Sequence, residues 1–157
     1  MPSALLEEGL TREIIAAFYE VYNQLGFGFL EGVYANALAL ELRNRGAIVA
    51  REVPVRVSYR GDLVGEYRAD MVVDGAVLVE VKATRVLDQH ARQQTLNYLR
   101  GTHFEVGLLL HFGPRPHFER VVSTGLDPRR SAGVPAAVGG IRRHPRSSGP
   151  GAEEFER

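Results

Sequence analysis

Apolar residues recur at every third or fourth position in the first part of the chain, which predicts two amphipathic helices. The first covers 8–25 and ends where Gly26 and Gly28 break the pattern. The second covers about 31–45 and ends at Gly46. The apolar stripe of the first helix consists of Leu10, Ile14, Phe18, Val21, Tyr22 and Leu25.

From residue 48 the pattern becomes an alternation of apolar and polar residues, which predicts β-structure. The first strand covers 48–59, and Pro54 within it indicates an edge strand or a bulge. One face of this strand carries Val53, Val55, Val57 and Tyr59, and the other carries Glu52, Arg56 and Ser58. A turn at 60–62 leads into a second strand over about 63–73.

Asp74-Gly75 is a strong signal for a two-residue hairpin turn, after which a third strand covers 76–83. Such a turn pairs Val73 with Ala76 and brings Asp70 close to residues 79 and 80. The remaining elements are a helix at 88–100, a strand at 104–112 and a short strand at 117–122. The order ααβββαβ(β) predicts an α/β fold, with a mixed sheet of four to five strands flanked by helices.

The composition changes near Ser123, which divides the chain into a folded domain and a tail. Residues 124–157 are rich in glycine, proline and arginine and have little apolar periodicity, so we expect a disordered tail. The tail holds six arginines against four acids. The predicted domain, residues 1–123, is slightly acidic, with 13 basic and 15 acidic residues.

The whole-chain composition excludes several classes of protein. With 45% hydrophobic and 24% charged residues, the 157-residue chain is typical of a globular protein. Its formal net charge of zero argues neither for nor against nucleic acid. It has no cysteine, which excludes disulfides and thiolate metal sites. No apolar run approaches the ~20 residues of a membrane span, and the first residues lack a signal peptide's basic charge, so we expect a cytoplasmic protein.

Lys82 is the only lysine among nineteen basic residues, and it lies close to two acids in the sequence. Asp70 and Glu80 fall on the two arms of the predicted hairpin at 74–75. Glu80 and Lys82 are two positions apart on one strand, so both point to the same face. Two carboxylates beside an ammonium group suit a hard cation such as Mg²⁺. The alternative is a salt-bridged cluster of these three residues with no function.

Four segments resemble motifs of the PD-(D/E)XK nuclease superfamily, and within it of the small bacterial GxxExxY proteins. They are Gly28-Phe29-Leu30-Glu31-Gly32-Val33-Tyr34, Arg68-Ala69-Asp70, Glu80-Val81-Lys82 and Gln94-Thr95-Leu96-Asn97-Tyr98. The resemblance spans about 10–122, nearly all of the predicted domain. It implies a restriction-endonuclease-like core.

The resemblance also implies the roles of particular residues. Asp70, Glu80 and the carbonyl of Val81 would bind Mg²⁺, with Mn²⁺ as a substitute. Lys82 would hold the attacking water or the developing charge on the phosphate. Glu31 would be an additional acid, bound to the metal directly or through water. Without the resemblance, an acid at this position in the first turn of a helix is explained equally well by the helix dipole.

Further residues are placed near the site by the same resemblance. Gln94 and Tyr98, at i and i+4 on one helix, would position the substrate, although an ordinary helix pair is the simpler reading. Tyr34 is expected in the core. His111 departs from the asparagine typical of the family and leaves the role of that position open. The other histidines lack the spacing of metal ligands. Arg85, Arg92 and Arg100 are candidates for phosphate contacts, although a solvated helix face explains them equally well.

The function implied is a Mg²⁺-dependent nuclease that hydrolyses phosphodiester bonds in DNA or RNA. Two alternatives remain open: a catalytically silent module that binds nucleic acid or a partner, and a metal-dependent phosphoesterase of small nucleotides. Members of the superfamily often dimerise to cut two strands. The strand at 48–59 or the helix at 8–25 could form the contact of a homodimer.

Overall fold

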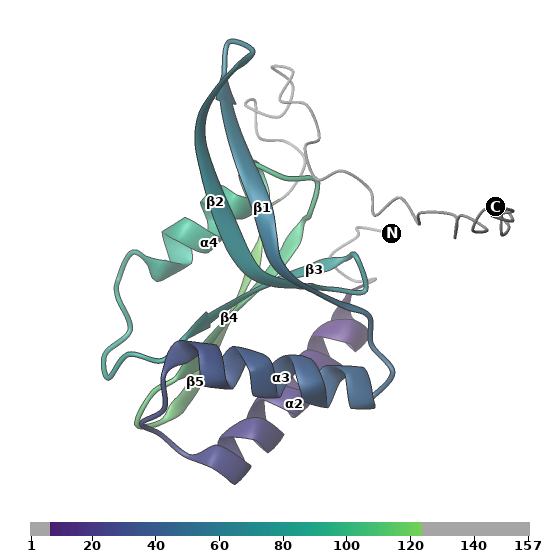
Figure 1. The fold of residues 1–157 in the computed structure, drawn as a ribbon, viewed down its shortest axis with the longest axis vertical. Helices are drawn as coiled ribbons and strands as arrows, with labels where there is room; N and C mark the ends of the chain where they lie inside the picture. Colours follow the sequence, from purple (N-terminus) through teal and green to yellow (C-terminus); the bar gives the residue numbers. More distant parts are fainter. Residues whose placement is uncertain (1–6, 124–157) are drawn as a thin grey trace, which may run out of the picture.

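The computed structural model describes residues 7–123, so the predicted tail lies outside the described residues. The described part forms three helices and five strands in the predicted order (Figure 1). They are α2 (Glu8–Leu25), α3 (Glu31–Asn44), β1 (Val49–Tyr59), β2 (Asp62–Val73), β3 (Val77–Lys82), α4 (Ala91–Arg100), β4 (Val106–Phe112) and β5 (Pro116–Val122). None of these helices is long and apolar enough to cross a membrane.

The five strands form one sheet in the order β1-β2-β3-β4-β5. The pair β3–β4 is parallel and the other three pairs are antiparallel, which confirms the predicted mixed sheet. The parallel pair requires a crossover, and α4 supplies it. The carboxyl ends of β3 and β4 therefore lie side by side, with Lys82 opposite His111.

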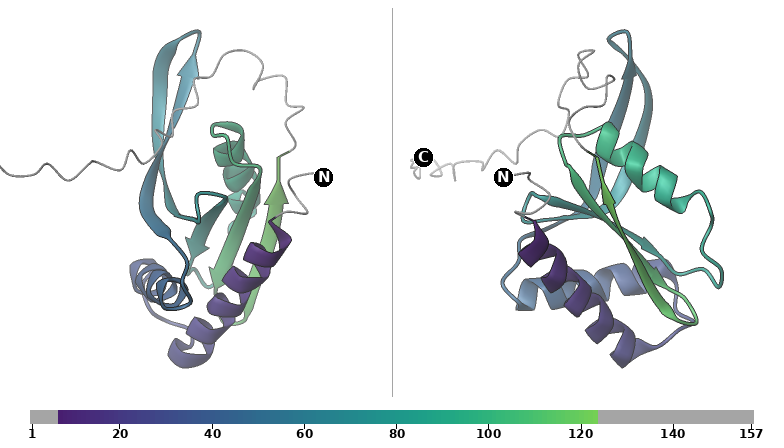
Figure 2. Two further views of the ribbon diagram at one scale, coloured as in Figure 1. Left: turned by 90° about the vertical axis from the view of Figure 1, so that its right-hand side faces the viewer. Right: turned by 180° about the vertical axis from the view of Figure 1, so that it is seen from behind.

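Two apolar cores cover the two faces of the sheet. Phe18 of α2 and Leu38 of α3 are fully buried in the larger core, against Val79 and Leu108 of the sheet. The smaller core lies on the other face, where α4 buries Leu99. Figure 2 shows α2 and α3 close together at one end of the molecule, and α4 apart from them beside β1 and β2. The alternation along β2 and β3 divides their side chains between these two cores.

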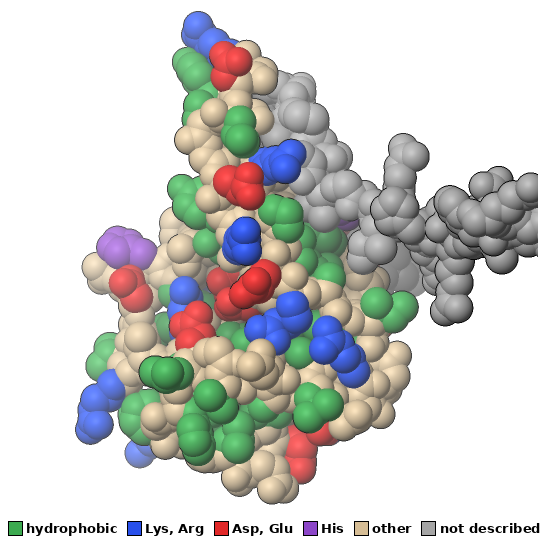
Figure 3. Space-filling view, in the orientation of Figure 1, with side chains coloured by type: hydrophobic (Ala, Val, Ile, Leu, Met, Phe, Trp, Pro, Cys, Tyr) green, Lys and Arg blue, Asp and Glu red, His purple; other side chains and the backbone are tan. Residues whose placement is uncertain are grey.

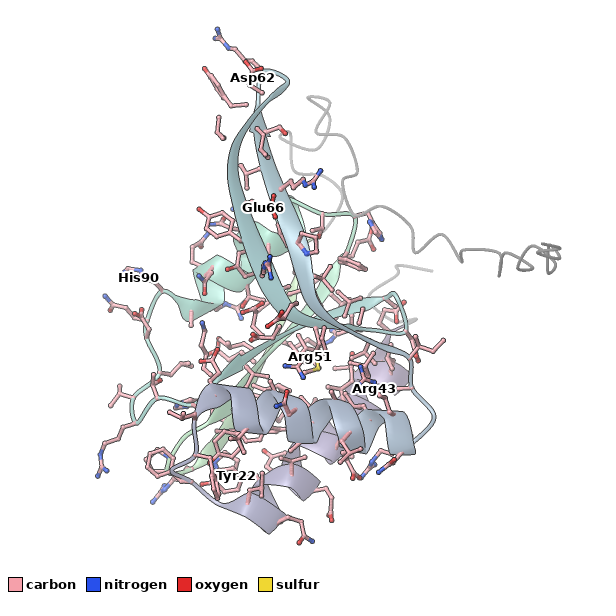
Figure 4. The ribbon with its side chains drawn as sticks, in the orientation of Figure 1. Tyr22, Arg43, Arg51, Asp62, Glu66 and His90 are labelled. Carbon is pink, nitrogen blue, oxygen red and sulfur yellow. The ribbon has the colours of Figure 1, made fainter. Side chains whose placement is uncertain are left out.

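The distal halves of β1 and β2 project beyond the body as a two-stranded arm, with Asp62 at its tip (Figures 1 and 4). Only the inner part of the apolar face of β1 is buried. Val53 and Val55 are buried, but Val57 is 36% exposed and Tyr59 is 62% exposed. The helical layer ends before the strands do, so the outer apolar positions have no partner layer. Pro54 lies on an edge strand, as predicted.

The hairpin turn between β2 and β3 differs by one residue from the prediction. The N–H of Ala76 does donate to the carbonyl of Val73 (3.0 Å), and both Asp74 and Gly75 have positive φ. The ladder, however, pairs Val73 with Val77, so three residues form the connection. A shift of one residue moves a side chain to the opposite face of a sheet. This shift places Asp70 and Glu80 on the same face.

Helix α4 begins at Ala91 rather than at residue 88. Asp88 forms a turn before it: its side chain accepts a hydrogen bond from the N–H of His90 (2.7 Å), and its carbonyl accepts one from the N–H of Ala91 (3.0 Å). Aspartate often forms such local bonds in place of a helical turn.

Candidate active site

The candidate site lies where β2 separates from β3. These strands pair only over three positions, from Met71↔Val79 to Val73↔Val77, before β2 leaves to form the arm. Asp70 is the first residue of β2 beyond the ladder, and the same register places it opposite Glu80. Figure 3 shows acidic and basic side chains gathered between the base of the arm and the helical body.

At this fork the two carboxylates accept backbone hydrogen bonds that the neighbouring strand would otherwise accept. The N–H of Asp70 donates to Oε1 of Glu80 (3.2 Å), and the N–H of Val81 donates to Oδ2 of Asp70 (2.6 Å). Backbone N–H groups buried without a partner are costly, so the strands can separate here because side-chain oxygens accept these hydrogen bonds. Each carboxylate keeps a second oxygen for another partner. Glu80 is almost completely buried, at 4% exposure.

Glu31 and Lys82 complete the group of charges. Glu31 is the first residue of α3, and Lys82 is the last residue of β3. The charge of Lys82 lowers the pKa of Glu31, Asp70 and Glu80, so the ammonium acts on all three carboxylates. The structure therefore brings together the four charged residues that the sequence selected.

Burial nevertheless raises the pKa of all three carboxyl groups, and repulsion from Asp70 raises the pKa of Glu31 and Glu80 further. For Glu80, burial and then the charge of Asp70 raise the pKa to about 8. For Asp70, burial raises the pKa more than the Val81 hydrogen bond and Lys82 lower it. For Glu31, desolvation by the surrounding protein and repulsion from Asp70 raise the pKa. The site thus holds more negative charge than Lys82 offsets, which favours a cation.

The donor set fits a hard divalent cation. Within residues 7–123, no three acidic or histidine side chains lie close enough to form a metal cage by themselves. Asp70 and Glu80 are the carboxylates placed at the fork itself, so an ion there would bind to these two first. Mg²⁺ commonly binds through one or two carboxylates and completes its octahedral shell with water and substrate oxygens.

Tyr34 fixes the loop that precedes Glu31. Its side chain is fully buried and stacks on Phe112, with ring centroids 4.4 Å apart, which confirms the expected core position. Its hydroxyl donates to the carbonyl of Gly26 and accepts from the N–H of Phe29 (3.2 Å). Gly28 within this loop has a φ of 120°, which side chains rarely adopt. The tyrosine therefore holds the start of α3 in place.

Arg51 is a residue of the site that sequence reasoning missed. Its Nη1 donates to Oδ1 of Asn36 on α3 (2.8 Å), and its Nε donates to the carbonyl of Asp70 (3.3 Å). Figure 4 shows it between the base of the arm and α3. Its charge also lowers the pKa of Asp70. The sequence did contain a signal for this contact. A hairpin turn at 60–61 would pair residue 51 with residue 70, whereas the structure pairs Arg51 with Met71, one position away.

His111 is buried beside the site. It lies opposite Lys82 on β4, is 6% exposed, and donates from Nε2 to the carbonyl of Thr84. Its ring occupies the space beside Gly113, where a Cβ would come within 2.5 Å. The histidine thus ties the segment after Lys82 to β4. The histidines at 90, 103 and 117 are exposed.

Gln94 and Tyr98 lie on the face of α4 that turns toward the arm. Both line a groove of about 840 Å³ between α4 and the arm. Burial, followed by the charges of Glu80 and Asp70, raises the pKa of Tyr98 to about 12, so Tyr98 lies within electrostatic reach of the fork. Of the three arginines proposed for phosphate contacts, only Arg100 lines this groove. Arg92 turns to Glu119 of β5 (3.8 Å).

Comparisons with known proteins agree with this arrangement. A family model described as the PD-(D/E)XK nuclease superfamily matches residues 8–121. This chain belongs to that superfamily. The match covers every strand of the sheet, so the two carboxylates and Lys82 lie within a PD-(D/E)XK domain. A search of curated proteins found no significant match.

The fold of this PD-(D/E)XK protein is similar to that in the crystal structure of SSO0001. The TM-score is 0.50 at 20% sequence identity, over 80% of this chain and 64% of that chain. This chain thus spans somewhat less than two thirds of the length of SSO0001. At this identity the likeness concerns the fold alone, a restriction-endonuclease-like mixed sheet with helices on both faces.

Proposed function

We propose that this protein is a divalent-metal-dependent nuclease that hydrolyses phosphodiester bonds in DNA or RNA. The observation that carries the proposal is the meeting of Asp70, Glu80 and Lys82 at the fork of β2 and β3, within a member of a nuclease superfamily. The segment 28–34 supports a place in the bacterial GxxExxY family, because its Glu31 faces this fork and its Tyr34 fixes the loop before it.

Asp70, Glu80 and the carbonyl of Val81 would hold Mg²⁺, or Mn²⁺ in its place, and Glu31 would bind the ion directly or through water. When bound, the ion would lower the pKa of a water ligand and neutralise charge on the phosphate.

The other side chains of the site act on the substrate. Lys82 carries a compact ammonium with three donors, which suits it to stabilise negative charge on the phosphate or to hold the attacking water. Because the pKa of Tyr98 is raised to about 12, its hydroxyl keeps its proton and can donate to a phosphate oxygen. Gln94 offers an amide from the same face of α4. These two residues would orient the substrate strand toward Lys82.

A cleavage assay with Lys82 variants tests the proposal. Wild-type protein with Mg²⁺ or Mn²⁺ should cleave at least one of single-stranded, duplex and branched DNA or RNA. Lys82→Ala should lower the rate about 100- to 1,000-fold, the usual cost of losing one group that stabilises charge in the transition state. Binding of the same substrate should stay within about twofold. A wild-type protein that binds the metal and cuts none of these substrates would exclude the nuclease.

A further inference from the structure

The groove between the arm and α4 has an open apolar wall that the fold itself does not use. We name it the arm groove: residues 56–60 and Tyr67 form one wall, and the face of α4 from His90 to Gly101 forms the other. Its arm wall continues the face of β1 that buries Val55 at the base. Beyond that point the same face carries the exposed side chains of Val57 and Tyr59.

The aromatic residues of the arm groove are arranged to accept flat ligands. Tyr59 is 62% exposed and Tyr67 is 50% exposed, although both lie on strands. The ring of Tyr67 lies against that of Tyr98, with centroids 5.6 Å apart and a tilt of 43°. Exposed aromatic faces along a groove are the usual platforms on which the bases of a single strand stack.

The charge of the arm groove points to a polyanion. Arg60 and Arg100 line it together with His90, and no Asp or Glu is among its lining residues. Arg56 also borders the groove, but its side chain lies on the opposite face of the arm from Val55 and pairs with Glu66 there at 3.7 Å. The tail at 124–157 is itself basic, with six arginines against four acids, so its charge does not complement the groove.

The arm groove also leads to the candidate active site. Tyr98 belongs to both: its ring meets Tyr67 in the groove, while the charges of Glu80 and Asp70 raise its pKa. Gln94 lines the groove one helical turn away. A strand lying in the groove would therefore continue toward the carboxylates at the fork.

We propose that the arm groove binds single-stranded nucleic acid, with bases stacked on Tyr67 and Tyr98 and phosphates held by Arg60 and Arg100. This inference rests on the proposed nuclease function and names the form of its substrate. The groove volume lies within the ~300–1,000 Å³ of sites that enclose a small ligand, which suits a few unstacked nucleotides rather than a duplex. The strand enters between the arm and α4 and is cut where it passes the fork.

The test measures binding of the full-length protein by fluorescence anisotropy in EDTA, where no cleavage interferes. The probes are single-stranded DNA and RNA of about 12 nucleotides, the matching duplexes, and an abasic strand with the same phosphates. Tyr67→Leu removes a stacking platform and should weaken binding of the normal strand about 5- to 150-fold, the effect of losing one base–aromatic stack. It should leave the abasic strand unaffected. Tyr19→Leu, at a half-exposed tyrosine on α2, is the matched control and should change neither.

A second variant keeps the test informative if Tyr67→Leu does not fold. Arg60→Gln should reduce the slope of log binding constant against log salt concentration by about 0.7, the value for one phosphate contact with a single strand. Arg12→Gln, at an exposed arginine on α2, is its control. Equal affinity for single strand and duplex, or wild-type binding by both Tyr67→Leu and Arg60→Gln, would overturn the inference.

Cleavage assays on the same samples separate this inference from the nuclease proposal. Binding that depends on Tyr67, without cleavage by wild-type protein, would support the arm groove and reject the nuclease. Cleavage that is unchanged by both Tyr67→Leu and Arg60→Gln would support the nuclease and reject the arm groove.

Discussion

Glu80 accepts a hydrogen bond from the backbone N–H of Asp70, at 3.2 Å, at the point where their strands separate. The side chain of Asp70 in turn accepts from the backbone N–H next to Glu80. Two carboxylates are thereby held close together in a largely buried place, and repulsion between them helps to raise the pKa of Glu80 to about 8. In the metal-free protein this repulsion persists until a cation binds or one of the carboxylates is protonated.

The first prediction concerns stability and pH in the absence of metal. The pKa of Glu80 rises from 4.5 in the unfolded chain to about 8 in the folded protein, so the folded state binds the proton more tightly. Its contribution to stability is fully present below about pH 4.5 and is lost as pH rises through about 8. The pKa shifts of Asp70 and Glu31 have the same sign. Urea unfolding in EDTA should show the free energy falling by a few kcal/mol over this window.

Glu80→Gln removes the largest of these contributions. It should be more stable than wild type at pH 8 in EDTA, and its free energy of unfolding should depend less on pH. Asp62→Asn, at the exposed tip of the arm, is the control and should keep the wild-type profile. A wild-type stability that rises between pH 5 and 8 would contradict this account of the site.

The second prediction concerns the loop before Glu31. Tyr34→Phe removes the hydroxyl that contacts Gly26 and Phe29 and leaves the ring on Phe112. Loss of these hydrogen bonds should cost about 1–2 kcal/mol of stability in urea unfolding. Cleavage should also slow, because Glu31 loses its support. Tyr19→Phe, at an exposed tyrosine, should change neither, and an unaltered Tyr34→Phe protein would show that the loop is held by other contacts.

The third prediction concerns Arg51. Arg51→Gln should lower stability by about 1 kcal/mol, since it removes the link from Asn36 on α3 to the carbonyl of Asp70. It should also raise the pKa of Asp70 further, because a nearby positive charge is lost. NMR titration of the Asp70 carboxyl measures the shift directly. Arg12→Gln should leave this titration unchanged, and a lowered pKa in Arg51→Gln would contradict the geometry.

The fourth prediction compares two glycines. At Gly113 an added Cβ would come within 2.5 Å of the buried His111 ring, so Gly113→Ala should destabilise the protein by about 1–3 kcal/mol. At Gly32, within α3, a Cβ meets nothing within 4 Å, so Gly32→Ala should stabilise it by about 0.5–1 kcal/mol. Thermal unfolding of both variants measures the contrast. If both substitutions changed the stability equally, the ring of His111 would have to move aside from the new Cβ at little cost.

Much of the fold follows from periodicity because each element buries one face. The helix at 8–25 is found with its predicted bounds, since Gly26 ends it with a positive φ that glycine readily adopts. Burial along the arm could not be predicted in the same way. Alternation at Val57 and Tyr59 shows that a strand forms, but it does not show how far the covering layer extends.

The residues that form the site could be predicted from the sequence, but the strand register that brings them together could not. Asp70, Glu80 and Lys82 stand out because charges in an apolar strand need a partner. The predicted turn at 74–75 nevertheless placed Asp70 opposite residue 79, on the wrong register by one residue. A single bulged residue beside a turn leaves almost no trace in composition. The role of Arg51 depended on the same kind of detail, a register shift between Val57 and Ser58 in the first hairpin.

The most direct test of the proposed site is a calorimetric titration with Mg²⁺ and Mn²⁺ at pH 8, with cleavage measured on the same samples. Asp70→Asn keeps an acceptor for the Val81 N–H but removes the charge, and Asp62→Asn is the matched control on the arm. The account predicts that wild type and Asp62→Asn bind the ion and cleave nucleic acid, while Asp70→Asn loses both. Absence of ion binding in the wild type, or unchanged binding by Asp70→Asn, would contradict it.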